Sequence, residues 1–87
     1  MNYFVFAIKD TAVQEFAPPY FARTRAEGVR MFTDAVNNED RNNMLGNHPK
    51  DFELWLIGEW RTDSAVLKPC DQERLAVGAD VRLVSER

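Results

Sequence analysis

The sequence predicts an α+β fold in which a small antiparallel or mixed β-sheet carries one principal α-helix on one face. Residues 3–8 and 52–61 have the composition and side-chain alternation of β-strands. Between them, residues 24–36 place apolar side chains at helical spacing behind a capping motif. A chain of 87 residues has room for one hydrophobic core, so we expect a single domain over residues 1–87.

The first strand is apolar at every position of residues 3–8, YFVFAI, and therefore on both of its faces. This pattern is typical of a strand that lies inside a sheet or is covered at an interface. Residues 10–14 predict a turn. Residues 16–21, FAPPYF, predict an extended aromatic loop or a short edge strand, because consecutive prolines remove amide donors and disfavour helix.

The predicted helix begins at Thr24, whose hydroxyl can accept from the third helical amide while Glu27 reaches back to the Thr24 amide. Gly28 inside the helix costs about 1 kcal/mol relative to alanine. It indicates either a close backbone approach to the sheet or a tolerated weakness. The stripe expected to face the core consists of Ala26, Val29, Phe32, Thr33 and Val36.

The second half of the chain predicts a long irregular connection over residues 37–51, then a strand over 52–61. Residues 61–64 predict a turn, residues 65–68 a returning hairpin strand, residues 71–77 a short turn of helix, and residues 81–84 a last edge strand. In the strand, simple alternation predicts one apolar face of Phe52, Leu54, Leu56, Gly58 and Trp60. It predicts a mixed face of Glu53, Trp55, Ile57, Glu59 and Arg61.

Catalytic and metal chemistry find little support in the sequence. His48 is the single histidine and Cys70 the single cysteine, so no cluster has metal-ligand spacing, and we expect His48 to hold the loop before the strand. Glu53 and Glu59 would lie about 20 Å apart along a strand, too far for paired acid and base catalysis. We therefore expect neither an enzyme nor a cofactor.

Charge and hydropathy constrain the partners and the compartment. The net charge of −3 does not indicate the basic surface on which DNA binding usually rests. No apolar stretch approaches the roughly 18 residues that would span a bilayer, so no membrane partner is expected. An unpaired cysteine suits a reducing compartment such as the cytoplasm.

One segment combines aromatic rings with positive charge. Tyr20, Phe21, Arg23 and Arg25 directly precede the helix, whose free amides could also receive a phosphate. The alternative is that Phe21 lies in the core, Tyr20 is half-buried and the arginines are ordinary surface residues. The next candidate DNA contacts are Arg41 and Lys50, on or beside the long loop.

A second candidate surface would join copies of the chain. Because the domain is short and its first strand is apolar on both faces, we predict a homo-oligomer. The expected subunit contact consists of Tyr3, Val5, Trp55 and Ile57. Trp55 favours a protein partner over DNA, since Glu53 and Glu59 on the same predicted face would repel phosphates.

The run MFTDAVNNEDRNNMLGNHPKDFELWLIGEW resembles the small nonstructural protein of gokushovirus-type microviruses, tailless phages with circular single-stranded DNA genomes. The likeness extends over most of the chain, although Trp60 stands where that family more often has Phe and Arg61 where an acidic residue is common. The residues that carry it are Phe32, Asp34, Ala35, Val36, Asn37, His48, Pro49, Asp51, Phe52, Leu54, Gly58 and Trp60.

The resemblance implies a phage protein made in the bacterial host cytoplasm that binds single-stranded DNA or assists the switch from replication to packaging. It implies no particular DNA-contact residue. Two hypotheses follow: a single-stranded DNA-binding protein without sequence preference, or a homo-oligomeric module that engages phage replication or capsid-assembly proteins.

Overall fold

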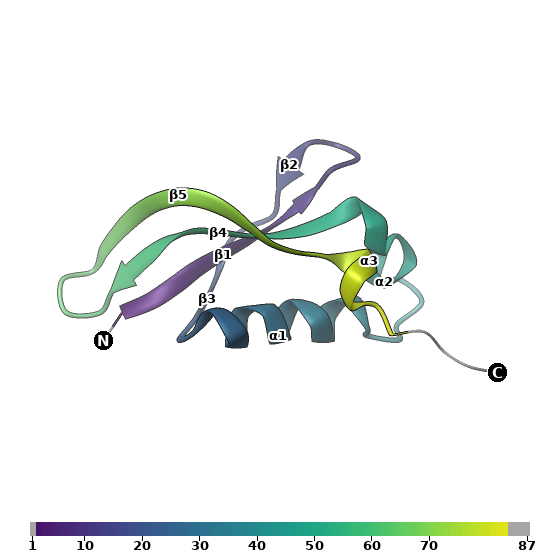
Figure 1. Ribbon diagram of the computed structural model, residues 1–87, viewed down its shortest axis with the longest axis horizontal. Coiled ribbons are helices and arrows are strands. Elements are labelled where there is room, and N and C mark those ends of the chain that lie inside the picture. The colour runs from purple at the N-terminus through teal and green to yellow at the C-terminus, as the bar shows by residue number, and fades with distance from the viewer. Residues whose placement is uncertain (1, 84–87) are drawn as a thin grey trace.

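The computed structural model describes residues 2–83 and confirms the α+β class, with a five-stranded antiparallel sheet and one principal helix on one face (Figure 1). The strands are β1 (Asn2–Asp10), β2 (Glu15–Phe16), β3 (Tyr20–Ala22), β4 (Phe52–Arg61) and β5 (Val66–Val77). The helices are α1 (Arg25–Val36), α2 (Met44–Asn47) and α3 (Gly78–Val81), with a 3₁₀ turn, η1, at Pro49–Asp51.

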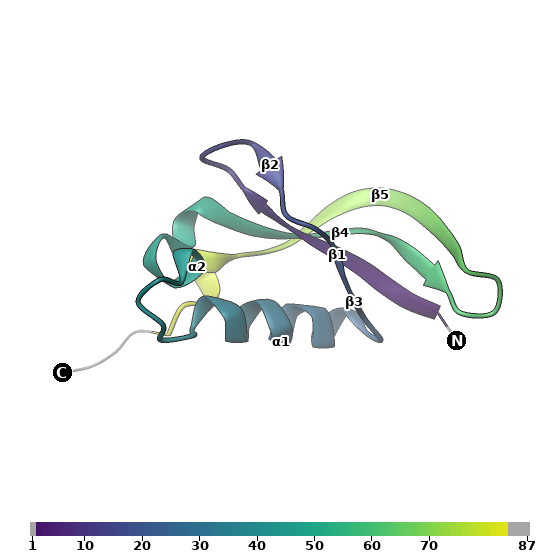
Figure 2. The ribbon, with the colours of Figure 1, turned by 180° about the vertical axis from the view of Figure 1, so that it is seen from behind.

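Strands β1 and β4 form the interior of the sheet. β4 pairs with β1 on one side and with β5, the edge strand, on the other. The remaining side of β1 is shared by two short strands, β2 toward its C-terminal end and β3 toward its N-terminal end (Figure 2). The prediction of an internal first strand is therefore confirmed. The prolines at 18 and 19 separate β2 from β3, as the extended aromatic segment predicted.

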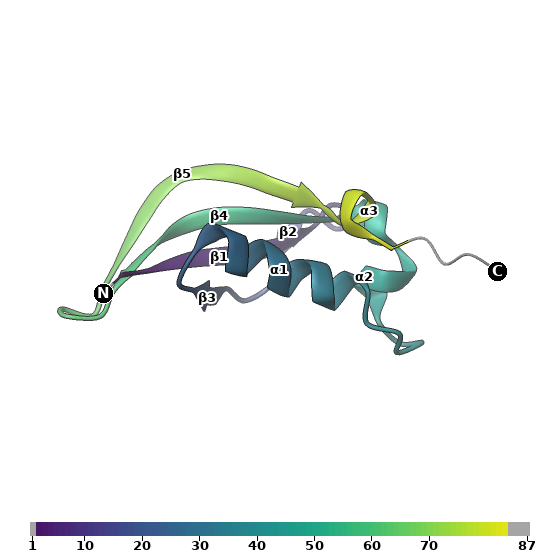
Figure 3. The same cartoon turned by 60° about the horizontal axis from the view of Figure 1, so that its bottom comes forward.

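The hydrophobic core lies between α1 and the sheet. Phe6 of β1, Leu54 of β4 and Phe32 and Val36 of α1 are each 0% exposed. Burying one such side chain stabilises the fold by about 1.5–3 kcal/mol. Figure 3 shows α1 lying across this face, while the β4–β5 hairpin curves away beyond the N-terminal end of the helix.

Helix α1 begins at the predicted cap. The Thr24 hydroxyl accepts from the Glu27 amide at 3.0 Å. The Glu27 carboxylate accepts from the Arg23 amide at 2.8 Å, one residue earlier than predicted. Gly28 is buried, and a Cβ there would collide with the Phe6 ring, so close approach to the sheet explains this glycine.

Two predictions near the C-terminal end were wrong. Residues 71–77 belong to β5, because pairing with β4 along the hairpin outweighs their weak helical pattern. Val81 ends α3 and so is no edge strand, and residues 82–83 carry no strand; Val84 lies outside the described residues. The sheet therefore ends at β5.

The connection over residues 37–51 is more ordered than predicted, because it contains α2 and η1. The His48 amide donates to the Met44 carbonyl at 2.9 Å, and its carbonyl accepts from the Asp51 amide at 2.9 Å. The Asp51 carbonyl accepts from the amide of Thr11 at 2.8 Å and from its hydroxyl at 3.0 Å. These bonds fix the entry into β4.

Candidate functional site

The face of the sheet opposite α1, called the outer face below, carries an unusual number of aromatic side chains. Its members follow from the pairing register, because residues directly opposite each other on antiparallel strands point to the same face. The outer face comprises Tyr3, Val5, Ala7, Lys9, Phe16, Phe21, Glu53, Trp55, Ile57, Trp60, Leu67, Pro69 and Arg74.

A β-bulge at Ile57 decides this composition. Phe6 pairs with Leu56 on the helix side, whereas the next residue of β1, Val5, pairs with Gly58, so Ile57 is the extra residue on β4. Every side chain beyond the bulge changes face relative to simple alternation. The prediction for the strand was therefore wrong at its end: Trp60 lies on the outer face and Glu59 on the helix side.

One ring pair covers the N-terminal half of β1. Phe21 of β3 and Trp60 of β4 stack across β1 with ring centroids 5.9 Å apart and planes inclined by 18°. Val5, which pairs with Phe21 across the strands, is only 1% exposed although no helix covers it. Phe21 itself remains 43% exposed, so its ring is available to a ligand and does not lie in the core.

A second ring pair covers the C-terminal half of β1. Phe16 of β2 and Trp55 of β4 meet edge to face, with centroids 6.3 Å apart and planes inclined by 77°. Ala7, paired with Trp55, is 2% exposed beneath it. The Lys9 ammonium lies 5.6 Å from the centroid of the Phe16 ring, which places a positive charge beside this pair.

The acidic groups of the outer face are fewer and better compensated than alternation predicts. Glu59 lies on the other face because of the bulge. Glu53 accepts from the Trp55 indole at 3.0 Å and forms an ion pair with Arg74 at 3.3 Å. The repulsion of phosphates that favoured a protein partner for Trp55 is therefore largely removed.

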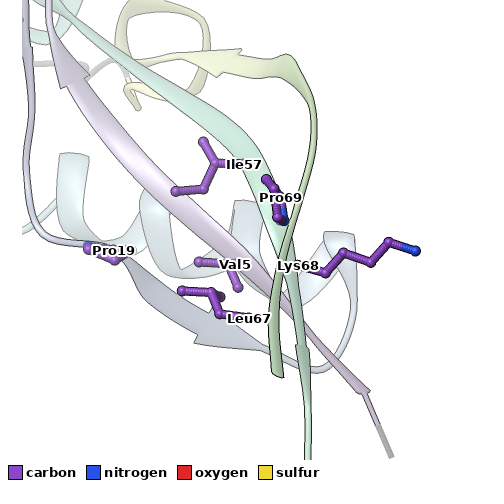
Figure 4. A pocket seen from close by; sticks show the side chains of 7 residues that line it. Val5, Pro19, Ile57, Leu67, Lys68 and Pro69 are labelled. Atoms are coloured by element: carbon purple, nitrogen blue, oxygen red, sulfur yellow. The ribbon is translucent and has the colours of Figure 1, made fainter. Parts of the chain in front are cut away.

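An apolar hollow of about 250 Å³ opens between the two ring pairs, at the level of the bulge. Its walls come from β1, β4, β5 and the segment before β3 (Figure 4). Lys68 borders it, but the Lys68 side chain points away from the hollow (Figure 4). The lining residues are Val5, Pro19, Ile57, Gly58, Leu67, Lys68 and Pro69.

The structure disperses the predicted DNA contacts. The Tyr20 ring stacks on Phe6, 5.5 Å between centroids, and its hydroxyl donates to the Gly28 carbonyl at 2.8 Å. Burial raises the pKa of Tyr20 to about 12. This tyrosine therefore packs on the helix side of the sheet, whereas Phe21 faces the opposite way.

The predicted basic residues lie in three places. Arg23 is exposed two residues after Phe21. Arg25 forms an ion pair with Glu73 at 3.0 Å. Arg41 and Lys50 are exposed beyond the C-terminal end of α1, a helix of 12 residues, or about 18 Å, away from its start.

The predicted oligomer contact is the better assembled set. Tyr3, Trp55 and Ile57 are partly exposed on the outer face, so the structure brings them together. Val5 belongs to the same face but lies beneath the ring pair at 1% exposure. A partner would therefore touch the rings above Val5, not Val5 itself.

Three residues of the outer face were missed by the sequence reasoning: Phe16, Lys9 and Trp60. The signal for Trp60 was Gly58, because an isolated glycine inside a strand pattern often marks a bulge or a close backbone approach. A Cβ at Gly58 would lie 2.7 Å from the Lys68 carbonyl oxygen of the neighbouring strand. Phe16 and Lys9 carry no local signal, since only strand pairing places them beside Trp55.

Among residues 2–83, no group of three or more histidine, cysteine or carboxylate side chains is placed to hold a metal ion. The His48 side chain is exposed. Within the described part of the chain, no helix is both long and apolar enough to cross a membrane.

A single antiparallel sheet with one helix-covered face and one aromatic face defines a small binding domain. Comparison with known proteins gives the family: residues 3–81 match the family described as Phage ORF5 protein. The chain belongs to this phage family, since the match covers nearly all of its length. No curated protein and no solved structure matches the chain.

Proposed function

We propose that this protein is a nonstructural protein of a gokushovirus-type phage that binds single-stranded DNA on its outer face, without strong sequence preference. It acts in the host cytoplasm during genome replication or packaging. The observation that carries the proposal is the arrangement of two aromatic pairs, Phe21 with Trp60 and Phe16 with Trp55, on the helix-free face of an antiparallel sheet.

Aromatic rings on a sheet face suit single strands because every base has a π-face that can stack on them. Such stacking contributes about 1–3 kcal/mol per base and tolerates any sequence. Single-stranded binding also needs positive charge near the rings. Lys9 supplies it beside Phe16, and Arg74 offsets the one carboxylate that lies beside Trp55.

The test is binding of a fluorescein-labelled oligothymidine at low salt, followed by anisotropy and by quenching of tryptophan fluorescence. Phe21→Leu removes the stacking ring and keeps an apolar cover over Val5. It should weaken binding about tenfold, near the middle of the energy expected for one stacked base.

The matched control is Met31→Leu. Met31 is 44% exposed, close to the 43% of Phe21, but it lies on α1 on the other side of the sheet. This variant should bind as the wild type does. Equal affinities of the Phe21 and Met31 variants, both folded by circular dichroism, would exclude the outer face as the DNA site.

A second candidate function is self-association through the outer face, or docking there of phage replication or capsid-assembly proteins. The exposed apolar side chains favour it, since Phe16, Phe21 and Leu67 are 42%, 43% and 57% exposed. Light scattering separates the candidates. A stable dimer that does not bind oligothymidine, and that dissociates on Trp55→Glu substitution, would support association as the main role of this face.

A further inference from the structure

We infer that the hollow between the two ring pairs is a base subsite. It receives a nucleobase of the bound strand that lies between two ring-stacked bases, and it holds that base by shape and apolar contact without reading its identity. This inference rests on the proposed binding of single-stranded DNA and adds a third position to that site.

The position of the hollow is the first argument. Trp55 and Trp60 are five residues apart on β4, and the hollow opens at Ile57 and Gly58 between them. Five residues span about 16 Å in a regular strand, and the bulge shortens this somewhat. Bases at the duplex spacing of about 3.4 Å would fit several times into that distance. A strand that stacks on both ring pairs therefore carries at least one base over the hollow.

The size and lining of the hollow are the second argument. Its volume of about 250 Å³ lies just below the roughly 300–1,000 Å³ of pockets that hold drug-sized ligands, so it suits a single ring system. The side chains that face it are those of Val5, Pro19, Ile57, Leu67 and Pro69 (Figure 4). None of these carries a hydrogen-bonding group, and discrimination between bases needs such groups on their edges.

The charge around the hollow is the third argument, because it matches a strand whose bases point down and whose phosphates stay outside. The only charged residue in the wall, Lys68, directs its side chain away from the cavity (Figure 4). The cations of the outer face lie instead beside the Phe16–Trp55 pair, at Lys9 and Arg74. An apolar floor with cations at its margin excludes phosphate from the hollow and admits an uncharged ring.

The test combines a protein variant with an altered oligonucleotide. Leu67→Ala removes apolar contact at the mouth of the hollow and should weaken binding of oligothymidine about fivefold. Its control is Val66→Ala. Val66 is the neighbouring residue, is also exposed at 46%, and points to the other side of β5, so its loss should leave affinity unchanged.

A series of eight-nucleotide strands with one abasic site at each position in turn completes the test. If a base occupies the hollow, one abasic position should weaken binding to the wild type but not further weaken binding to Leu67→Ala, because both changes remove the same contact. Replacing the thymine at that position by adenine, cytosine or guanine should change affinity less than threefold.

Three results would overturn the inference, and they point to different faults. Additive losses at every abasic position would show that no base enters the hollow, although the outer face still binds DNA. A change of tenfold or more between bases would show that the subsite reads identity. Absence of any binding by the wild type would remove the proposed function and the subsite together.

Discussion

Replacement of Gly28 by alanine tests the packing between α1 and the sheet. A Cβ at this position would collide with the Cζ, Cε1 and Cε2 atoms of the Phe6 ring. Phe6 cannot easily retreat, because it is 0% exposed and stacks on Tyr20 with 5.5 Å between ring centroids. The substitution therefore forces either the ring or the helix to move.

Two opposing free energies set the expected size of the effect. Alanine improves the helix propensity of α1 by about 1 kcal/mol. Overpacking of a dense core typically costs about 1–3 kcal/mol, and the collision with a whole ring edge places Gly28→Ala at or above the upper end. We expect a net loss of about 1–2 kcal/mol in the free energy of unfolding, which lowers Tm by about 4–16 °C in a domain of this size.

Urea denaturation followed by tryptophan fluorescence measures this loss. Ala26→Gly, at an exposed position of α1, serves as the control for helix propensity alone. Phe6→Leu should relieve the collision, so the Gly28→Ala and Phe6→Leu variants combined should lose less than the sum of the two single losses. A Gly28→Ala protein that is more stable than the wild type would refute the reasoning, since it would show that helix propensity outweighs packing here.

Three further predictions concern other contacts. Tyr20→Phe should cost about 1 kcal/mol through the lost bond to the Gly28 carbonyl and leave oligothymidine affinity unchanged; weakened binding would show that Tyr20 contacts DNA after all. Because the folded pKa of Tyr20 is about 12 and the unfolded value about 10, its stabilisation is complete below pH 10 and declines as the pH rises toward 12. In a pH series of urea melts, the half-exposed ring should account for a loss of about 1 kcal/mol, which Tyr20→Phe abolishes. Gly58→Ala should cost about 1–3 kcal/mol, because its Cβ meets the Lys68 carbonyl at 2.7 Å, and a thermal melt that matches the wild type would contradict the tight strand pairing at the bulge.

The sequence alone determined the elements whose cause is local. Residues 3–8 are apolar at every position, Thr24 can cap its own helix, and the prolines at 18 and 19 prevent helix, so each of these segments has one favoured conformation. The fold class followed, because two strands flanking one amphipathic helix have few ways to bury their apolar faces. The Phage ORF5 match covers the same segments.

Tertiary structure decided what depends on strand pairing. Residues 71–77 have a weak helical pattern, yet they extend β5, because an already formed β4 offers them a full ladder of hydrogen bonds. Tyr20 and Phe21 are adjacent in sequence but part to opposite faces, because β3 is extended and pairs with β1.

The composition of the outer face was also decided by pairing. Simple alternation places Trp60 in the core and Glu59 beside Trp55, and the bulge at Ile57 exchanges them. The physical reason is that the side-chain period of a strand is two, so one extra residue on β4, set by its pairing with β1, reverses every face that follows. The sequence thus contained the aromatic residues of the candidate site, but the register of the sheet assembled them.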